Sequence, residues 1–217
     1  MPGLFKWGGR KEDEPRPAPA AAVPPPAPEP SNTSKVLPKV LSALAGQPSP
    51  VLMDLGPVVG ANISFFGDRL ACKFYVEDFF AEVEQHARTG TRDQLGAIFA
   101  TRLKYPAGSI DGILCWDLFD YLDKPAAHAL AKQLVRVLRS GGALFALFNA
   151  TEAVSTAKSY TRFVVGDEDT IQHRPYAAAR GKQKPLPNRD ILRMFEPLRV
   201  TEQFLLKTNT REMLFRK

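Results

Sequence analysis

Cysteine and histidine are scarce in this chain of 217 residues, which has two cysteines, three histidines and no C-x-x-C pair. These low counts predict that the protein has no zinc site and no disulfide framework. Cys72 and Cys115 each lie in an apolar run, so we expect them to be small buried hydrophobic residues in a reducing compartment.

Long apolar runs are also missing. A transmembrane helix needs about 18 or more consecutive apolar residues, and no stretch of the sequence approaches that length. The N-terminal residues lack the apolar segment of a signal peptide. We therefore expect a cytoplasmic protein with no transmembrane segment.

Proline is abundant but unevenly spread, because many of the 19 prolines lie between Glu14 and Pro30. Such a segment cannot bury enough apolar surface to offset the entropy lost on ordering. The composition predicts a disordered Pro/Ala-rich tail over residues 1–33 and a single folded domain over residues 34–217. A tail of this kind is suited to tethering a protein partner.

Short, continuously apolar runs alternate with segments of helical periodicity along the domain. The alternation predicts an α/β fold with a Rossmann-like, doubly wound, mostly parallel sheet and a C-terminal antiparallel hairpin. Between residues 78 and 103 the only candidate strand is Gly96–Ala100, and the residues before 188 are expected to form an irregular basic loop. We expect helices over 34–45, 62–70, 79–86, 124–138 and 188–197, and strands over 51–55, 72–76, 110–116, 143–148, 199–206 and 210–215.

A glycine-containing turn follows the first of these strands, in the sequence V-L-M-D-L-G-P-V-V-G-A-N that spans residues 51–62. Glycines between a strand and a helix let the backbone approach a ligand and direct free N–H groups at an anion. Glu77 lies 21 residues after Gly56, at the end of the next expected strand, where an acid can bind ribose hydroxyls. These features predict a nucleoside-containing cofactor, although a tight turn and a solvated acid would also explain them.

Three segments resemble motifs of the class I S-adenosylmethionine-dependent methyltransferases, in the order found in that family. Asp54-Leu55-Gly56, with Gly60, resembles its first motif, D/E-x-G-x-G-x-G, except that Val58 replaces the middle glycine and leaves less room beside the cofactor. Residues 103–117 resemble its L-P-F-P-x-G-S-F-D-x-V stretch, and residues 138–144 resemble its L-x-P-G-G-x-L stretch. The domain is similar to methyltransferase type 11 domains.

The resemblance implies methyl transfer from S-adenosylmethionine. Asp54 would order the turn and help to hold the cofactor's amino group, and the backbone of Gly56 and Gly60 would face its methionine part. Glu77 would bind the ribose, with Asp78 as the alternate if the strand shifts by one residue. Asn62 would cap the following helix or contact the ligand. The cofactor-binding residues so implied are Asp54, Gly56, Gly60, Asn62, Glu77, Asp78, Trp116 and Asp117.

The acceptor of the methyl group is expected to be a small or anionic molecule, because guanidinium groups in the basic loop suit a carboxylate or phosphate. Nucleic acid is disfavoured, since the sequence has no RNA-binding motif. No catalytic residue is assigned, because the sulfonium of the cofactor is already an activated methyl donor. The candidate substrate residues are Tyr121, Tyr160, Arg162, His173 and Arg174.

Two alternatives remain open. Val58 and the missing third strand would fit a catalytically degenerate member of the same fold that serves as a binding or scaffold protein. An NAD-type oxidoreductase would carry G-x-G-x-x-G, and residues 56–61 do not have that spacing.

Overall fold

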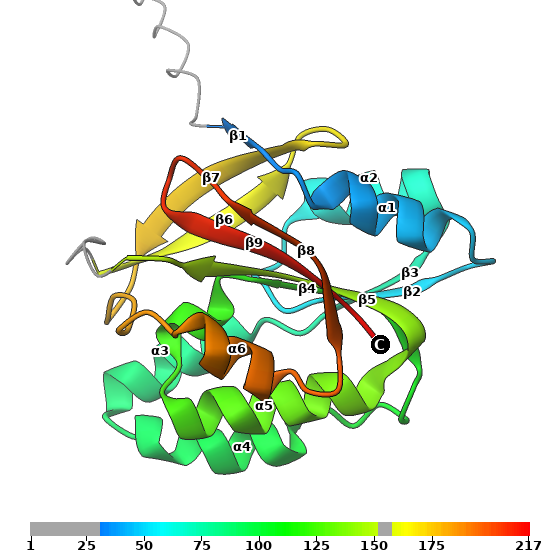
Figure 1. Cartoon of the computed structure of the whole chain (residues 1–217). Coiled ribbons are helices and arrows are strands. Elements are labelled where there is room, and N and C mark those ends of the chain that lie inside the picture. Colours follow the sequence, from blue (N-terminus) through cyan, green and yellow to red (C-terminus); the bar gives the residue numbers. More distant parts are fainter. Residues whose placement is uncertain (1–30, 152–157) are drawn as a thin grey trace, which may run out of the picture.

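The fold is built around a six-stranded sheet with strand order β3-β2-β4-β5-β9-β8 (Figure 1). The computed structural model describes residues 31–151 and 158–217. Strands β3, β2, β4 and β5 are parallel, whereas β9 is antiparallel to both β5 and β8. This confirms the Rossmann-like fold with a C-terminal antiparallel hairpin. The strands are β2 (Val51–Asp54), β3 (Lys73–Val76), β4 (Ile110–Trp116), β5 (Leu138–Asn149), β8 (Arg199–Leu205) and β9 (Thr210–Arg216).

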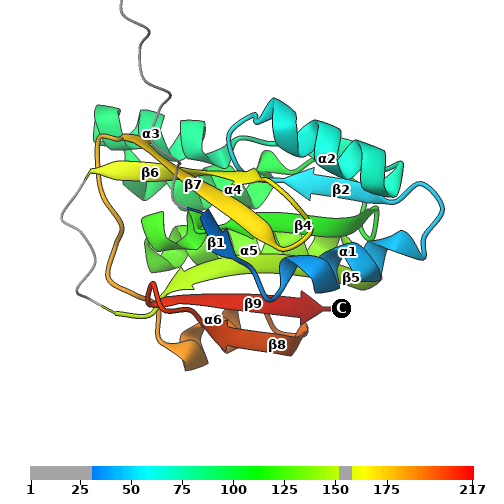
Figure 2. The same ribbon diagram turned by 90° about the horizontal axis from the view of Figure 1, so that it is seen from above.

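Each face of the sheet is covered by a separate hydrophobic core. We call the buried cluster beneath α3–α6 the α5-side core, and the cluster beneath α1, α2 and a small second sheet the α1-side core (Figures 1 and 2). Among the described residues, no helix combines the length and apolarity needed to cross a membrane. The helices are α1 (Leu37–Ala45), α2 (Gly60–Leu70), α3 (Phe79–Thr89), α4 (Leu95–Arg102), α5 (Lys124–Val137) and α6 (Asn188–Met194).

Helix α5 shows how local sequence sets these boundaries. Asp123 caps its first turn by accepting a hydrogen bond of 3.0 Å from the Ala126 N–H, and Pro125 occupies a position where its missing N–H costs nothing. Leu130, Leu134 and Val137 form a stripe that is buried in the α5-side core. Burying each side chain of this size contributes about 1.5–3 kcal/mol.

The candidate strand at Gly96–Ala100 is not formed, because these residues belong to α4. Leu95 and Phe99 are spaced by one helical turn and are both buried in the α5-side core. Helix α4 packs closely on α5 at this point, since a Cβ atom at Gly96 would be in van der Waals contact, 3.6 Å from the carbonyl carbon of Pro125. Strand β3 is therefore an edge strand of the described sheet.

The expected irregular basic loop is also wrong over much of its length. Strands β6 (Ser159–Val165) and β7 (Thr170–Ala177) form an antiparallel hairpin, which β1 (Ser31–Thr33) extends to three strands. Phe163 and Ile171 face the α1-side core, whereas the basic residues Arg162 and Arg174 are exposed. Figure 2 shows this small sheet beside α1 and α2, over the central sheet.

Candidate functional site

The turn after β2 lies at the carboxyl ends of three parallel strands. Asp54, the last residue of β2, pairs with Val76 of β3 on one side and with Leu114 of β4 on the other. The N–H of Glu77 donates a hydrogen bond of 2.8 Å to the Asp54 carbonyl oxygen. The backbones of the two predicted cofactor acids are therefore adjacent, as the strand order requires.

Asp54 is buried and organises the turn. Its Oδ1 atom accepts hydrogen bonds of 2.7 Å from the Gly56 N–H and 2.6 Å from the Trp116 indole Nε1–H. Burial raises the pKa of the Asp54 carboxyl to about 6, although hydrogen bonds from Gly56, Trp116 and Asn62 act in the opposite direction. The carboxyl group thus holds both the turn and the indole.

Trp116, at the end of β4, fills the space over the turn. The indole is stacked on the ring of Phe163 in β6, with centroids 5.2 Å apart and planes 9° apart, and the residue is only 1% exposed. A Cβ atom at Gly56 would lie 2.9 Å from Trp116 Cδ1 and 3.0 Å from Nε1. The absence of a side chain at Gly56 is what lets the indole pack against the backbone.

We expected Val58 to reduce the room beside the cofactor, but its side chain does not point into the turn. It is 64% exposed, on the outer side of the loop. The side chain that occupies the space beside Gly56 is Trp116, which comes from a different strand, so the sequence of the turn alone could not reveal it.

Substitution of Gly56 tests this packing. Gly56→Ala is expected to lower the free energy of unfolding by about 1–3 kcal/mol, because its methyl group would overlap the indole. Gly60→Ala is the matched control, since a Cβ atom at Gly60 meets nothing within 4 Å. Urea denaturation of the two variants measures the difference, and equal stability would contradict the packing.

Asn62 lies inside α2 and does not cap it, which corrects the capping prediction. The N-cap residue is Val59. The Asn62 side chain is buried, and it donates to the Phe163 carbonyl at 3.0 Å and accepts from the Val165 N–H at 2.8 Å. Asn62 therefore fastens the small sheet over α2.

Glu77 is held by groups on the other side of the central sheet. Its carboxylate accepts a hydrogen bond of 2.7 Å from Arg102 and another from the Tyr105 hydroxyl. Tyr105 packs against the α5-side core, whereas Trp116 belongs to the α1-side core. The carboxylates of Asp54 and Glu77 are thus engaged on opposite faces, although their backbones are neighbours.

A hollow of about 560 Å³ lies beside Glu77. Asp78, the alternate acid, instead caps α3 by accepting a hydrogen bond of 3.0 Å from the Ala81 N–H. The other residues that line the hollow are Ile98, Thr101, Arg102, Lys104 and Tyr105.

Asp117 belongs to a buried ionic cluster that includes a lysine the sequence analysis did not single out. Lys182 Nζ lies 2.7 Å from Asp117 Oδ2 and 2.9 Å from Asp120 Oδ2, and both aspartate side chains are only 2% exposed. Asp120 also accepts from the Asn149 N–H at 3.0 Å. Nothing in the local sequence distinguishes Lys182 from the other basic residues around it.

Charge and burial compete in this cluster. Burial raises the pKa of Asp120 to about 6, against the attraction of Lys182. Burial lowers the pKa of Lys182, but the two carboxylates outweigh it and leave that pKa above its ordinary value. Lys182 ties the segment after β7 to the end of β4.

The candidate substrate residues fall into two groups. Tyr121 and Tyr160 are core residues, with ring centroids 4.7 Å apart, and the Tyr121 hydroxyl donates to the Ser159 carbonyl at 3.0 Å. The other three, Arg162, His173 and Arg174, lie on the hairpin. His173 is half-buried 5.0 Å from the Phe163 ring, and burial lowers the pKa of its imidazole. The basic members of the group therefore lie on the small sheet and not in a loop.

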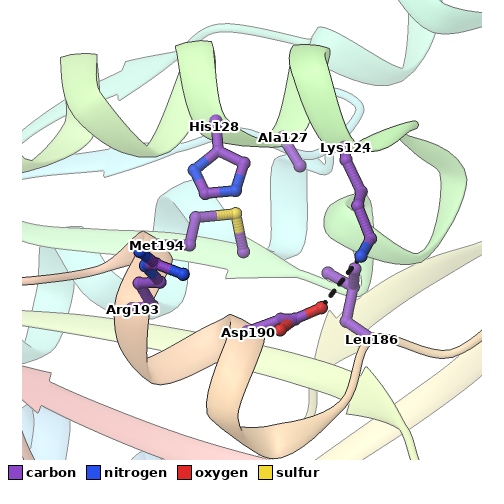
Figure 3. A pocket seen from close by; sticks show the side chains of 7 residues that line it. All are labelled: Lys124, Ala127, His128, Leu186, Asp190, Arg193 and Met194. Carbon is purple, nitrogen blue, oxygen red and sulfur yellow. Dashed lines mark hydrogen bonds and ion pairs between the residues drawn. The ribbon is translucent and has the colours of Figure 1, made fainter.

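A separate pocket of about 220 Å³ lies between α5 and α6 and is unrelated to the predicted site (Figure 3). Lys124 and Asp190 form an ion pair of 3.0 Å on one side of it, and His128 and Arg193 lie on the other. None of the residues predicted to bind cofactor or substrate lines this pocket.

Residues 53–146 match the family model described as "Methyltransferase domain". The match confirms the resemblance to the class I family, whose cofactor is S-adenosylmethionine. The matched segment begins one residue before Asp54 and ends within β5, so it includes the glycine turn, Glu77 and Trp116.

Several solved methyltransferase structures resemble the chain at low identity. The glycopeptide N-methyltransferase MtfA, in complex with S-adenosylmethionine, is 12% identical with a TM-score of 0.46 (83% of this chain, 92% of that chain). The 1,6-didemethyltoxoflavin-N1-methyltransferase of Burkholderia thailandensis is 14% identical with a TM-score of 0.49 (84% and 77%). CcbJ of Streptomyces caelestis is 14% identical with a TM-score of 0.45 (83% and 93%). No match was found among curated proteins.

Proposed function

We propose that this protein is an S-adenosylmethionine-dependent methyltransferase that acts on a small or anionic acceptor. The observation that carries the proposal is the backbone contact between the two acids assigned to the cofactor. Asp54 and Glu77 end neighbouring parallel strands within the matched segment and are joined by a hydrogen bond of 2.8 Å. Ligands of open α/β sheets bind at this edge.

The two halves of the cofactor fit these residues differently. The hollow beside Glu77 supports binding of a nucleoside, whose ribose hydroxyls would replace Arg102 and Tyr105 as partners of the carboxylate. The methionine half does not fit in the described conformation, because Trp116 packs against Gly56. We therefore propose the site and the class of reaction and assign no catalytic step to any residue.

The exposed face of the small sheet supports an anionic acceptor. Arg162 and Arg174 are directly opposite each other on β6 and β7, and like charges in this position are mutually destabilising. Arg162 lies over the Tyr176 ring, 5.2 Å from its centroid, and Arg174 donates to Gln172 at 3.0 Å. A carboxylate or phosphate bound between the guanidinium groups could accept hydrogen bonds from both.

Cofactor binding tests the proposal. Isothermal titration and thermal-shift assays with S-adenosylmethionine and S-adenosylhomocysteine are expected to show binding to the full chain. Glu77→Gln is expected to weaken binding roughly tenfold or more, because hydrogen bonds to a charged group contribute about 1.5–3 kcal/mol. The exposed Asp93→Asn is the control. Absence of both heat and thermal shift at millimolar ligand would contradict the proposal.

A second candidate is a degenerate member of the family that serves as a binding or scaffold protein. The packing of Trp116 against Gly56 is the observation that favours it. Radiolabelled methyl transfer to a broad panel of acceptors discriminates the two, because a degenerate member would transfer no label. The NAD-type oxidoreductase has no support from the family match.

A further inference from the structure

Trp116 is held over the glycine turn by contacts from three directions. Its Nε1–H donates to Asp54 Oδ1 at 2.6 Å, and its ring is stacked on Phe163. Phe145 meets the ring edge-on, with centroids 5.8 Å apart. The indole has therefore replaced solvent at the point where the backbone of Gly56 would otherwise be accessible.

The backbone at Trp116 is unusual for so large a residue. Its φ is +51°, in the left-handed region that bulky side chains seldom adopt. The pairing of β4 with β5 also shifts register between Leu114 and Trp116. Strain of this kind is maintained only where surrounding contacts enforce it, and it is concentrated at functional sites.

The contacts that the indole makes are those that a bound cofactor would need. The resemblance assigns the Asp54 carboxylate to the amino group of S-adenosylmethionine, and here Oδ1 of that carboxylate accepts from the indole and from the turn. The surface of Gly56, assigned to the methionine part, is covered by the ring. The indole and the methionine part of the ligand would need the same surface of Gly56, and both cannot occupy it.

We propose that Trp116 is an internal competitor for the cofactor, so that burial of its indole and binding of the methionine half of S-adenosylmethionine are mutually exclusive. This inference rests on the site assigned under the proposed function. It adds that Trp116 limits the affinity of the chain for the cofactor, and that neither Val58 nor the position of β3 as an edge strand does so.

Substitutions at Trp116 give the first test. Trp116→Ala is expected to bind S-adenosylhomocysteine at least tenfold more tightly than the unaltered chain, measured by isothermal titration. Trp116→Phe removes the N–H donor and part of the ring, and it is expected to bind with intermediate affinity. It provides the test if the alanine variant does not fold. Phe195→Ala is the control, because it removes a buried ring from the α5-side core without touching the turn.

Tryptophan fluorescence gives a second readout. The chain has two tryptophans, so Trp7→Phe leaves Trp116 as the only one. Saturating S-adenosylhomocysteine is expected to shift the emission of this protein to longer wavelength, because the displaced indole becomes hydrated.

The outcomes separate this inference from the proposed function. Binding to the Trp116 variants but not to the unaltered chain would support the competitor and count against methyl transfer by this protein. Binding to the unaltered chain with unchanged emission, and no gain in Trp116→Ala, would overturn the competitor and leave the proposed function intact. A folded Trp116→Ala that binds neither ligand would overturn both.

Discussion

Lys182→Met is expected to lower the free energy of unfolding by about 3 kcal/mol at pH 8. Removing one partner of a buried ion pair typically costs about 3–5 kcal/mol. We expect the low end of this range because the Lys182 side chain is 20% exposed. The loss arises because Asp117 and Asp120 would remain buried as two unbalanced carboxylates. Urea denaturation measures it.

The pH dependence of this variant has a definite sign. The pKa of Asp120 is raised to about 6 in the folded chain, so between pH 4 and pH 6 the native state binds more protons than the unfolded state. The contribution of Asp120 therefore makes the native state less stable as pH rises through this window. Without Lys182 the pKa of Asp120 rises further. The loss of unfolding free energy caused by Lys182→Met is therefore expected to be smaller at pH 5 than at pH 8.

Matched variants check the cause. Lys132→Met, at an exposed position on α5, is expected to change stability little. Combining Lys182→Met with Asp117→Asn and Asp120→Asn removes all three charges and is expected to recover much of the loss. A Lys182→Met protein as stable as Lys132→Met at pH 8 would contradict the interpretation.

Asn62→Ala is expected to lower the free energy of unfolding by about 2–4 kcal/mol, since each buried polar group left without a partner costs about 1–3 kcal/mol. Strand β6 is an edge strand of the small sheet, and the Asn62 amide pairs with the carbonyl of Phe163 and the N–H of Val165 along that edge. The side chain thus takes the place of a neighbouring strand.

Hydrogen exchange gives a local readout for Asn62. The amide of Val165 is expected to exchange faster in Asn62→Ala, whereas the amides of β4 would change only with global stability. Ser64→Ala, exposed on the same helix, is the control. Unchanged protection at Val165 would show that β6 is held in place by other contacts.

The central sheet could be predicted because its strands carry a strong local signal. Ile110–Trp116 is largely apolar, and the structure has a strand with these bounds that is buried throughout. The strands expected over 199–206 and 210–215 leave residues 207–209 as the turn of the final hairpin, and Asn209 adopts a φ of +57° there. In both segments neighbouring residues favour the conformation that the fold requires.

The prediction failed where distant contacts outweigh local pattern. In α4, the segment Gly96–Ala100 was a candidate strand, but the packing of Leu95 and Phe99 in the α5-side core decides the conformation. In the hairpin, basic residues on the exposed face concealed the apolar face that Phe163 and Ile171 present to the α1-side core. Propensity is a weak guide when burial decides the outcome.

The sequence by itself determined the order of the strands of the central sheet, the methyltransferase motifs and the positions of Asp54 and Glu77 along the chain, because these depend on residues close to one another. Only the tertiary structure decided what surrounds those acids. Trp116 reaches Asp54 from 62 residues away along the chain, and Arg102 reaches Glu77 from 25 residues away. Their placement follows from how the two cores pack, and no local pattern encodes it.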